Sequence, residues 1–144
     1  MAELARHDVS LVGCFASKEA CDALERTAQA SVFRIAEDEV MLIGASADSD
    51  VRAAAQELDP EAVVLDVTDG WTAWSLSGDD VQRAFCHVSE LRLPDEGFIQ
   101  GEVAGVPARV AVSRDRLDLF VEAMWGEHLR DRLSRCPGVS ETAP

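Results

Sequence analysis

The stretch from residue 63 to residue 123 most strongly constrains the fold of this chain. An apolar run at residues 62–65 overlaps its start and predicts a buried strand. The stretch continues at residues 71–76 with side chains that alternate between two faces. Ser77-Gly78-Asp79-Asp80 then predicts a helix start, because a serine can accept a first-turn N–H and aspartates complement the positive helix end. Its apolar stripe is Val81, Ala84, Phe85 and Val88.

The second part of this stretch predicts a hairpin and one more strand. Residues 98–103 and 106–112 flank a glycine, and Pro107 indicates an edge position because proline has no N–H for the ladder. Residues 117–123 alternate again after a turn, and a last helix follows with Trp125 on its apolar side. Cys136-Pro137-Gly138 ends that helix, so residues 136–144 are predicted to be a flexible tail.

The first part of the chain adds two helices and a hairpin. Residues 17–30 predict a helix capped by Ser17, and residues 31–36 and 40–44 predict strands on either side of a polar turn. A second helix opens at Asp50 and ends at Asp59-Pro60. This order predicts an α+β fold, with a mainly antiparallel sheet covered by helices, as one domain over residues 1–135.

Charge and hydropathy exclude two classes of partner. The formal charge of −14 repels a phosphate backbone, which argues against nucleic-acid binding. The acidic surface is either a solvated face or a face that docks on a basic partner. No stretch approaches the roughly 20 apolar residues that span a bilayer, and the first eight residues carry no signal segment. We therefore expect a cytoplasmic protein without membrane contact.

The four cysteines do not form a metal or redox motif, because none belongs to a C-x-x-C pair. In a reducing compartment they stay free thiols. Cys21 and Cys86 fall on predicted apolar helix faces and are expected in the core. Cys136, beside a proline near the polar end of the chain, is expected to be exposed.

A search for catalytic patterns predicts no catalytic, cofactor-binding or metal-binding residue. Dinucleotide, P-loop and hydrolase-elbow glycine motifs are absent. His87 follows Cys86, but adjacent helical residues do not face each other, so a shared metal is disfavoured. Asp66 and Asp69 flank a bend and are either ligand or acid–base groups or turn residues, the turn being favoured.

Four side chains are candidates for a partner interface. Trp71 and Trp74 lie on opposite faces of one predicted strand, so that either both are core or one of them contacts a partner. Tryptophan and arginine are enriched among the anchors of protein interfaces. The candidate set is Trp71, Trp74, Arg114 and Trp125.

The run from Val64 to Val81, VLDVTDGWTAWSLSGDDV, resembles the V-x-D-x-S/T-D…L-S-G-P-D-A signature of gamma subunits of heterotetrameric sarcosine oxidase. Residues 91–94 resemble the L-D-L step that follows the helix in that family, and the likeness covers about residues 31–135. Asp79-Asp80 stands where the family has P-D. The folate-binding acids of the related glycine-cleavage T-protein have no counterpart after Arg114, and the K-G-C-Y-x-G-Q motif of iron–sulfur-repair folate proteins is absent.

The resemblance implies the fold of the aminomethyltransferase folate-binding domain. It also implies a non-catalytic assembly subunit of a heterotetrameric, flavin-dependent complex that oxidatively demethylates N-methyl amino acids or amines such as sarcosine. Its implied partners are a larger alpha subunit of the folate and NAD type, a flavin-binding beta subunit and a small zinc-binding delta subunit. FAD, FMN, NAD, zinc and tetrahydrofolate would then be held by those subunits or their interfaces, and none by this chain alone. A stand-alone folate-binding domain and an unrelated regulatory or adaptor domain remain the alternatives.

Overall fold

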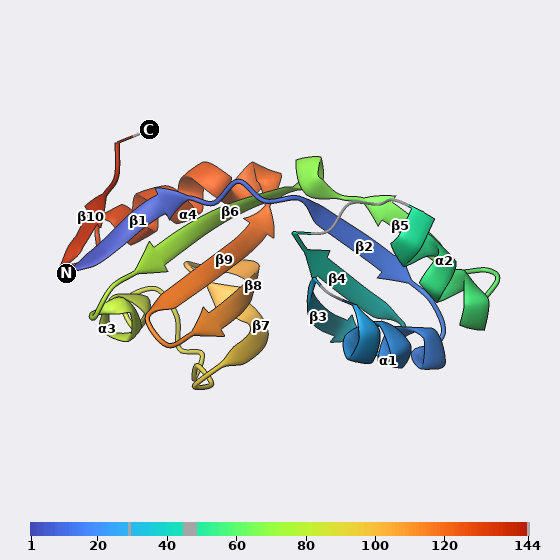
Figure 1. Cartoon of the computed structure of the whole chain (residues 1–144). Coiled ribbons are helices and arrows are strands. Elements are labelled where there is room, and N and C mark those ends of the chain that lie inside the picture. Colours follow the sequence, from blue (N-terminus) through green and yellow to red (C-terminus); the bar gives the residue numbers. More distant parts are fainter. Residues whose placement is uncertain (29, 45–48, 144) are drawn as a thin grey trace. The chain divides into compact units, whose positions relative to one another are not determined.

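The computed structural model describes residues 1–28, 30–44 and 49–143 and confirms the predicted α+β fold (Figure 1). The chain separates into two compact units, where the sequence led us to expect one domain over residues 1–135. The larger unit joins Met1–Asp8 to Gly70–Pro144, and the smaller unit is Val9–Asp69. Among the described residues, no helix has the length and apolarity needed to cross a bilayer.

The larger unit is built on a six-stranded sheet with the strand order β10-β1-β6-β9-β8-β7. Its neighbouring strands are antiparallel, except for the parallel pair β1 and β10. The strands are β1 (Ala2–Arg6), β6 (Trp71–Ser77), β7 (Gly97–Val103), β8 (Val106–Ser113), β9 (Arg116–Glu122) and β10 (Val139–Glu141). The sequence correctly predicted the four strands from β6 to β9.

Strands β10 and β1, which come first in the strand order of this sheet, were not predicted. In the structure, β10 lies within the segment 136–144 that we expected to be a tail, and pairs with β1 from Ala2 to Leu4 (Figure 1). The N–H of Thr142 extends this pairing by donating to the Leu4 carbonyl oxygen at 2.9 Å. A strand of three residues is too short to leave an alternating pattern, and its partner lies at the other end of the sequence.

One face of the six-stranded sheet is covered by α3 (Val81–Phe85) and α4 (Gly126–Ser134), the latter preceded by the 3-10 turn η2 (Ala123–Trp125). Trp74 and Leu76 of β6 belong to this core together with Leu119 of β9. The last helix was predicted, and it buries Leu129 and Leu133.

The predicted helix start at residues 77–80 is wrong in its details. Ser77 is the last residue of β6 and pairs with Glu3 of β1. Gly78 follows with a φ of +121° and lies against the backbone of Met1. The N-cap of α3 is Asp80, whose side chain makes no capping hydrogen bond. The pairing with the unpredicted strand β1 holds Ser77 in the sheet, and this shortens the helix.

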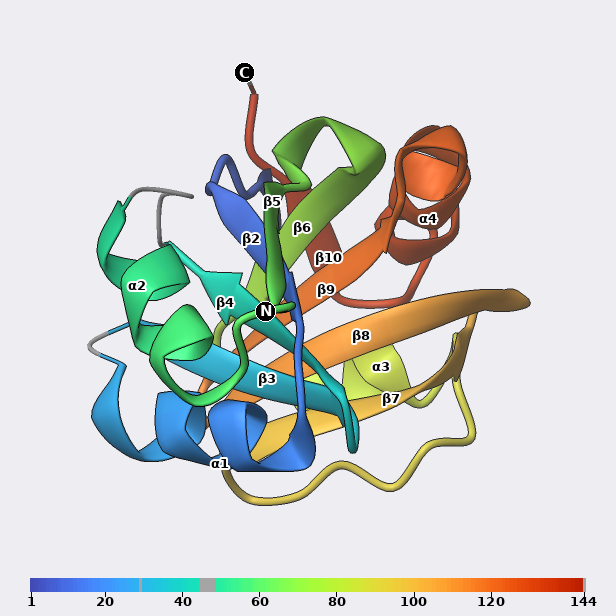
Figure 2. The same cartoon turned by 90° about the vertical axis from the view of Figure 1, so that its right-hand side faces the viewer.

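The smaller unit has a four-stranded antiparallel sheet with the order β3-β4-β2-β5. Helices α1 (Lys18–Thr27) and α2 (Ser49–Leu58) pack on one face of it (Figure 2). As predicted, Ser17 caps α1 and accepts a hydrogen bond from the N–H of Ala20 at 3.3 Å. The strands are β2 (Leu11–Phe15), β3 (Ser31–Ala36), β4 (Glu39–Ile43) and β5 (Val63–Asp66).

Strand β5 is not the buried strand that its apolar sequence predicted. It lies at the edge of the sheet, and only Val64 points toward the helices. Val63 and Leu65 are 47% and 50% exposed. The apolar run looked like a strand covered on both faces, but the fold covers just one of them. A 3-10 turn, η1 (Thr68–Gly70), comes between β5 and β6 in sequence.

Candidate functional site

The four predicted interface residues occupy three different environments in the larger unit. Trp74 is 6% exposed, and its indole N–H donates to the carbonyl oxygen of Gly126 at 3.0 Å. It is therefore a core residue and offers no surface to a partner. Trp71 is partly buried on the opposite face of β6, Trp125 is 37% exposed in η2, and Arg114 is exposed between β8 and β9.

The register of the sheet brings Trp71 and Trp125 to one end and leaves Arg114 at the other. Trp71 pairs with Glu122 of β9, which is three residues before Trp125. Arg114 lies in the turn next to the pair formed by Ser77 and Arg116, at the far end of the same two strands. Six residues of strand separate these ends, which is roughly 20 Å.

A pocket of about 350 Å³ opens beside Trp71. Within it, the guanidinium of Arg109 lies over the indole ring of Trp71, 4.3 Å from the ring centroid, which is a cation–π contact. Gln100 and Glu122 add an amide and a carboxylate. This set can bind polar groups on a planar ligand, but Arg109 already covers one face of the Trp71 ring. The remaining lining residues are Gly101, Pro107 and Ala108.

Arg109 and Glu122 were not predicted from the sequence as site residues. A signal for them was present in the sequence. In the predicted strands at 106–112 and 117–123, side chains alternate between two faces, as they do at residues 71–76. Side chains directly opposite each other in a sheet share one face. What the sequence lacked was the register, Trp71 with Glu122 and Arg109 with Gln100, which fixes the residues that meet.

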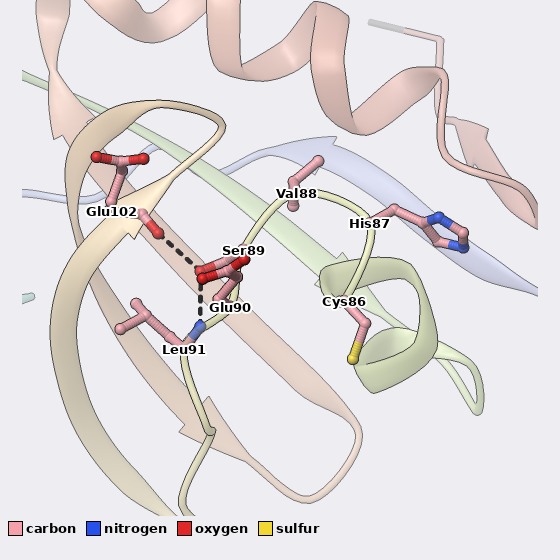
Figure 3. Close-up of a pocket in the computed structure, with 7 residues that line it drawn as sticks. All are labelled: Cys86, His87, Val88, Ser89, Glu90, Leu91 and Glu102. Carbon is pink, nitrogen blue, oxygen red and sulfur yellow. Dashed lines mark hydrogen bonds between the residues drawn. The ribbon is translucent and has the colours of Figure 1, made fainter.

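A second, larger pocket of about 690 Å³ is lined by residues 86–91 and Glu102 (Figure 3). The hydroxyl of Ser89 connects this segment to β7 by hydrogen bonds. Its hydroxyl donates to the Glu102 carbonyl oxygen at 2.7 Å and accepts from the N–H of Leu91 at 3.1 Å. The side chains of Cys86 and His87 point in different directions in Figure 3, as predicted for adjacent residues. Among the described residues, no three His, Cys, Asp or Glu side chains are grouped to hold a metal ion.

The predicted burial of Cys86 and Cys136 is reversed in the structure. Cys86 is exposed, because it lies outside the buried stripe of Val81, Ala84, Phe85 and Val88. Cys136 is buried beneath α4, and its thiol contacts the Arg132 carbonyl oxygen at 3.4 Å. Burial raises the pKa of the Cys136 thiol and of the Cys21 thiol, and raises the pKa of Cys14 to about 11.

We therefore expect thiol reagents to modify one cysteine before the other three. Only the thiolate reacts quickly, and the raised pKa values keep Cys14, Cys21 and Cys136 protonated at pH 8. Iodoacetamide followed by peptide mass mapping should place the first label on Cys86, with the others labelled only on unfolding. Equal labelling of Cys86 and Cys136 in the native protein would contradict the structure.

A polar cluster lies on the face of the six-stranded sheet opposite α3 and α4. The Ser75 hydroxyl donates to Asp118 at 2.5 Å, and Arg116 bonds both Asp118 and Ser75 at 2.9 Å. Arg116 also reaches Nδ1 of His7 at 3.2 Å. Since arginine can only donate, Nδ1 of His7 is the acceptor there. Ser75 thus donates its hydroxyl proton to a carboxylate and accepts a hydrogen bond from an arginine.

Asp66, one of the two acids considered from the sequence, forms a turn. Its carboxylate accepts the N–H of Thr68 at 2.9 Å. Hydrogen bonds from the side chain and backbone of Thr68 hold the pKa of Asp66 below its ordinary value. This is the turn role that the sequence favoured, with Asp66 ionised and engaged locally.

Comparison with known proteins gives structural matches only. No model of a known protein family and no curated protein matches the sequence. A chain of heterotetrameric sarcosine oxidase from Corynebacterium sp. U-96, in complex with pyrrole 2-carboxylate, superposes with a TM-score of 0.74 at 16% identity, covering 99% of this chain and 88% of that chain.

Two further structures extend this comparison. Glycine cleavage system aminomethyltransferase T from Bartonella henselae has a TM-score of 0.70 at 15% identity. The match covers 98% of this chain and 47% of the transferase, so the chain spans about half of its length. A domain from Porphyromonas gingivalis W83, described as a C-terminal regulatory domain of aspartate kinase, has a TM-score of 0.52 at 13% identity, with 94% of this chain and 96% of that chain covered.

These similarities define the fold class. The chain has an aminomethyltransferase-like α+β fold, as the sequence resemblance implied. At 13–16% identity the likeness concerns the fold alone.

Proposed function

We propose that this chain is a non-catalytic subunit of a heteromeric, flavin-dependent complex related to sarcosine oxidase. The observation that carries the proposal is the superposition over 99% of this chain and 88% of one chain of a heterotetrameric sarcosine oxidase. A match that complete indicates that the other chain is similarly small. The aminomethyltransferase, in contrast, has more than half of its length outside the match.

Under this proposal, the chemistry resides on partner chains. The complex would oxidatively demethylate N-methyl amino acids or amines, and larger alpha, flavin-binding beta and zinc-binding delta subunits would supply FAD, FMN, NAD, zinc and tetrahydrofolate. At the end of the sheet that carries Trp71 and Trp125, the half-exposed Trp125 is the candidate contact for assembly. The hydrogen bonds within the Ser75 cluster give those groups a structural role.

Co-expression with the neighbouring reading frames tests this assignment. With a tag on this chain, we expect larger chains and a flavin absorbance spectrum to co-elute. The assembled complex should oxidise sarcosine or another N-methyl amine, and the purified single chain should not. Elution of this chain alone, or oxidation by this chain alone, would contradict the proposal.

The alternative is a stand-alone folate-binding domain, which the superposition on aminomethyltransferase T and the Trp71 pocket favour. In that case Arg109, Gln100 and Glu122 would be the groups that contact the ligand. Titration of tetrahydrofolate into the isolated chain distinguishes the two functions, because a ligand that binds the native state raises the unfolding temperature. A rise that Trp71→Leu abolishes would support folate binding, and an unchanged unfolding temperature would exclude it.

A further inference from the structure

The smaller unit carries an apolar surface on the face of its sheet that the helices leave uncovered. We call it the β5 patch and define it by Phe15, Val63, Leu65 and Val67, arranged around Gly13. Phe15 is 44% exposed, similar to Val63 and Leu65. Exposed apolar groups that adjoin one another and are rimmed by polar residues mark interaction sites, whereas isolated ones need no explanation.

The register of β2 and β5 makes the patch continuous. Phe15 pairs with Val63, and Gly13 pairs with Leu65, so all four positions share one face. The intervening residues Val12, Cys14 and Val64 point the other way, into the core beneath α1 and α2. A Cβ placed on Gly13 would lie 3.3 Å from Val67 and 3.7 Å from Phe15, so these two side chains close over the glycine.

The outer edge of β5 is not arranged for strand addition. Arg52 of α2 donates to the Val64 carbonyl oxygen at 3.2 Å, and Gln56 donates to the Ala62 carbonyl oxygen at 3.4 Å. A strand that paired with β5 would have to displace these side chains. The patch is therefore suited to packing against a partner face, with no extension of the sheet.

The surroundings of the patch are strongly acidic. Residues 9–69 contain 13 acidic and 4 basic residues, a formal charge of −9 out of the −14 of the whole chain. Asp59 and Glu61 come four and two residues before Val63. Asp38 lies close to Phe15, since its carbonyl oxygen accepts the N–H of Ala16 at 3.0 Å.

Three of the four basic side chains of the smaller unit form ion pairs or hydrogen bonds within it. Lys18 pairs with Asp22 at 2.9 Å, and Arg34 pairs with Asp22 and Glu25. Arg52 is held at the edge of β5 by its hydrogen bond to the strand. The acidic excess is thus left for a partner to neutralise.

We propose that the β5 patch docks a partner protein whose contact face has an apolar centre flanked by arginine and lysine. The inference rests on the proposed function, under which the partner is a larger chain of the oxidase complex. Charge complementarity favours a basic partner protein over a second copy of this chain. An acidic rim is repelled by another acidic surface and attracted by a basic one. A second copy of this chain would bring two such rims together.

The test uses the full chain and the partner chain that co-purifies with it. Val63→Thr/Leu65→Thr removes apolar surface but keeps residues that favour strands. The matched control Leu58→Gln removes a side chain that is also half exposed, at the end of α2. By biolayer interferometry we expect the patch variant to raise Kd by about tenfold or more, because hot-spot residues dominate interface energy. The control should stay within about twofold of wild type, as expected for a site outside the contact.

Two further measurements separate the apolar and electrostatic parts. The unfolding midpoint of the patch variant should equal that of wild type, because the replaced side chains are half exposed. Glu61→Lys should weaken binding at low salt, and its difference from wild type should shrink as added salt screens the charges. An affinity unaffected by Glu61→Lys at low salt would contradict the charge argument.

The outcomes distinguish this inference from the proposed function. If wild type assembles with flavin-binding chains and the patch variant assembles equally tightly, the β5 patch is not the interface and the proposed function stands. If wild type assembles with no such chain, the proposed function fails, and the inference fails with it. If light scattering shows that wild type is a dimer and the patch variant is a monomer, a second copy of this chain occupies the patch and the inference is wrong.

Discussion

Phe85→Ala is expected to destabilise the larger unit by about 3–5 kcal/mol, the usual cost of truncating a buried phenylalanine. Phe85 is 1% exposed and is the largest side chain that α3 places in the core. Because α3 has five residues, it has almost no stability of its own and depends on this contact to stay on the sheet. The loss should therefore include both the cavity and part of the helix.

Tryptophan fluorescence during urea unfolding measures this effect selectively, because Trp71, Trp74 and Trp125 all belong to the larger unit. The control is Phe98→Ala, which removes the same side chain at a position 36% exposed on the edge strand β7. We expect it to cost about 1 kcal/mol or less, as is typical of surface sites. Equal losses for the two variants would show that Phe85 is not a core residue.

The elements that the sequence predicted correctly are those whose signals are local. Ser17 marks the start of α1, and the alternation from Trp71 to Leu76 identifies β6, because capping and side-chain period depend on a few adjacent residues. Strands β1 and β10 could not be found in this way. They pair with each other across almost the whole sequence, and each is short. Their pairing also keeps Ser77 in the sheet, where the local sequence suggested a helix cap.

In the candidate site, too, the features with a local sequence signal were predicted, and those that depend on distant partners were not. Placing Trp71 and Trp74 on opposite faces of a strand was correct, but deciding which one is core required the position of α4, whose Gly126 carbonyl receives the Trp74 N–H. Arg109 became part of the site through the register of three strands. The β5 patch could not be predicted for a different reason. A short apolar run is compatible both with a strand covered on two faces and with an edge strand covered on one face.

Gly126→Ala should destabilise the larger unit even though alanine favours helices by about 1 kcal/mol over glycine. A Cβ at this position would lie 2.6–2.8 Å from three side-chain atoms of Thr72. Thr72 is 6% exposed on the interior strand β6, and its β-branched side chain has few rotamers in which to withdraw. Overpacking of this kind typically costs about 1–3 kcal/mol, and here it also strains the Trp74 hydrogen bond to the Gly126 carbonyl.

We expect a net loss of about 2 kcal/mol in urea unfolding. Gly70→Ala is the matched control, because no atom lies within 4 Å of a Cβ built there. Thr72→Ser tests the mechanism, since it removes the Cγ2 atom that would lie 2.6 Å from the new methyl group. The double variant Gly126→Ala/Thr72→Ser should therefore lose less stability than the sum of the two single variants. Strict additivity would mean that the clash with Thr72 is not what makes glycine necessary at the start of α4.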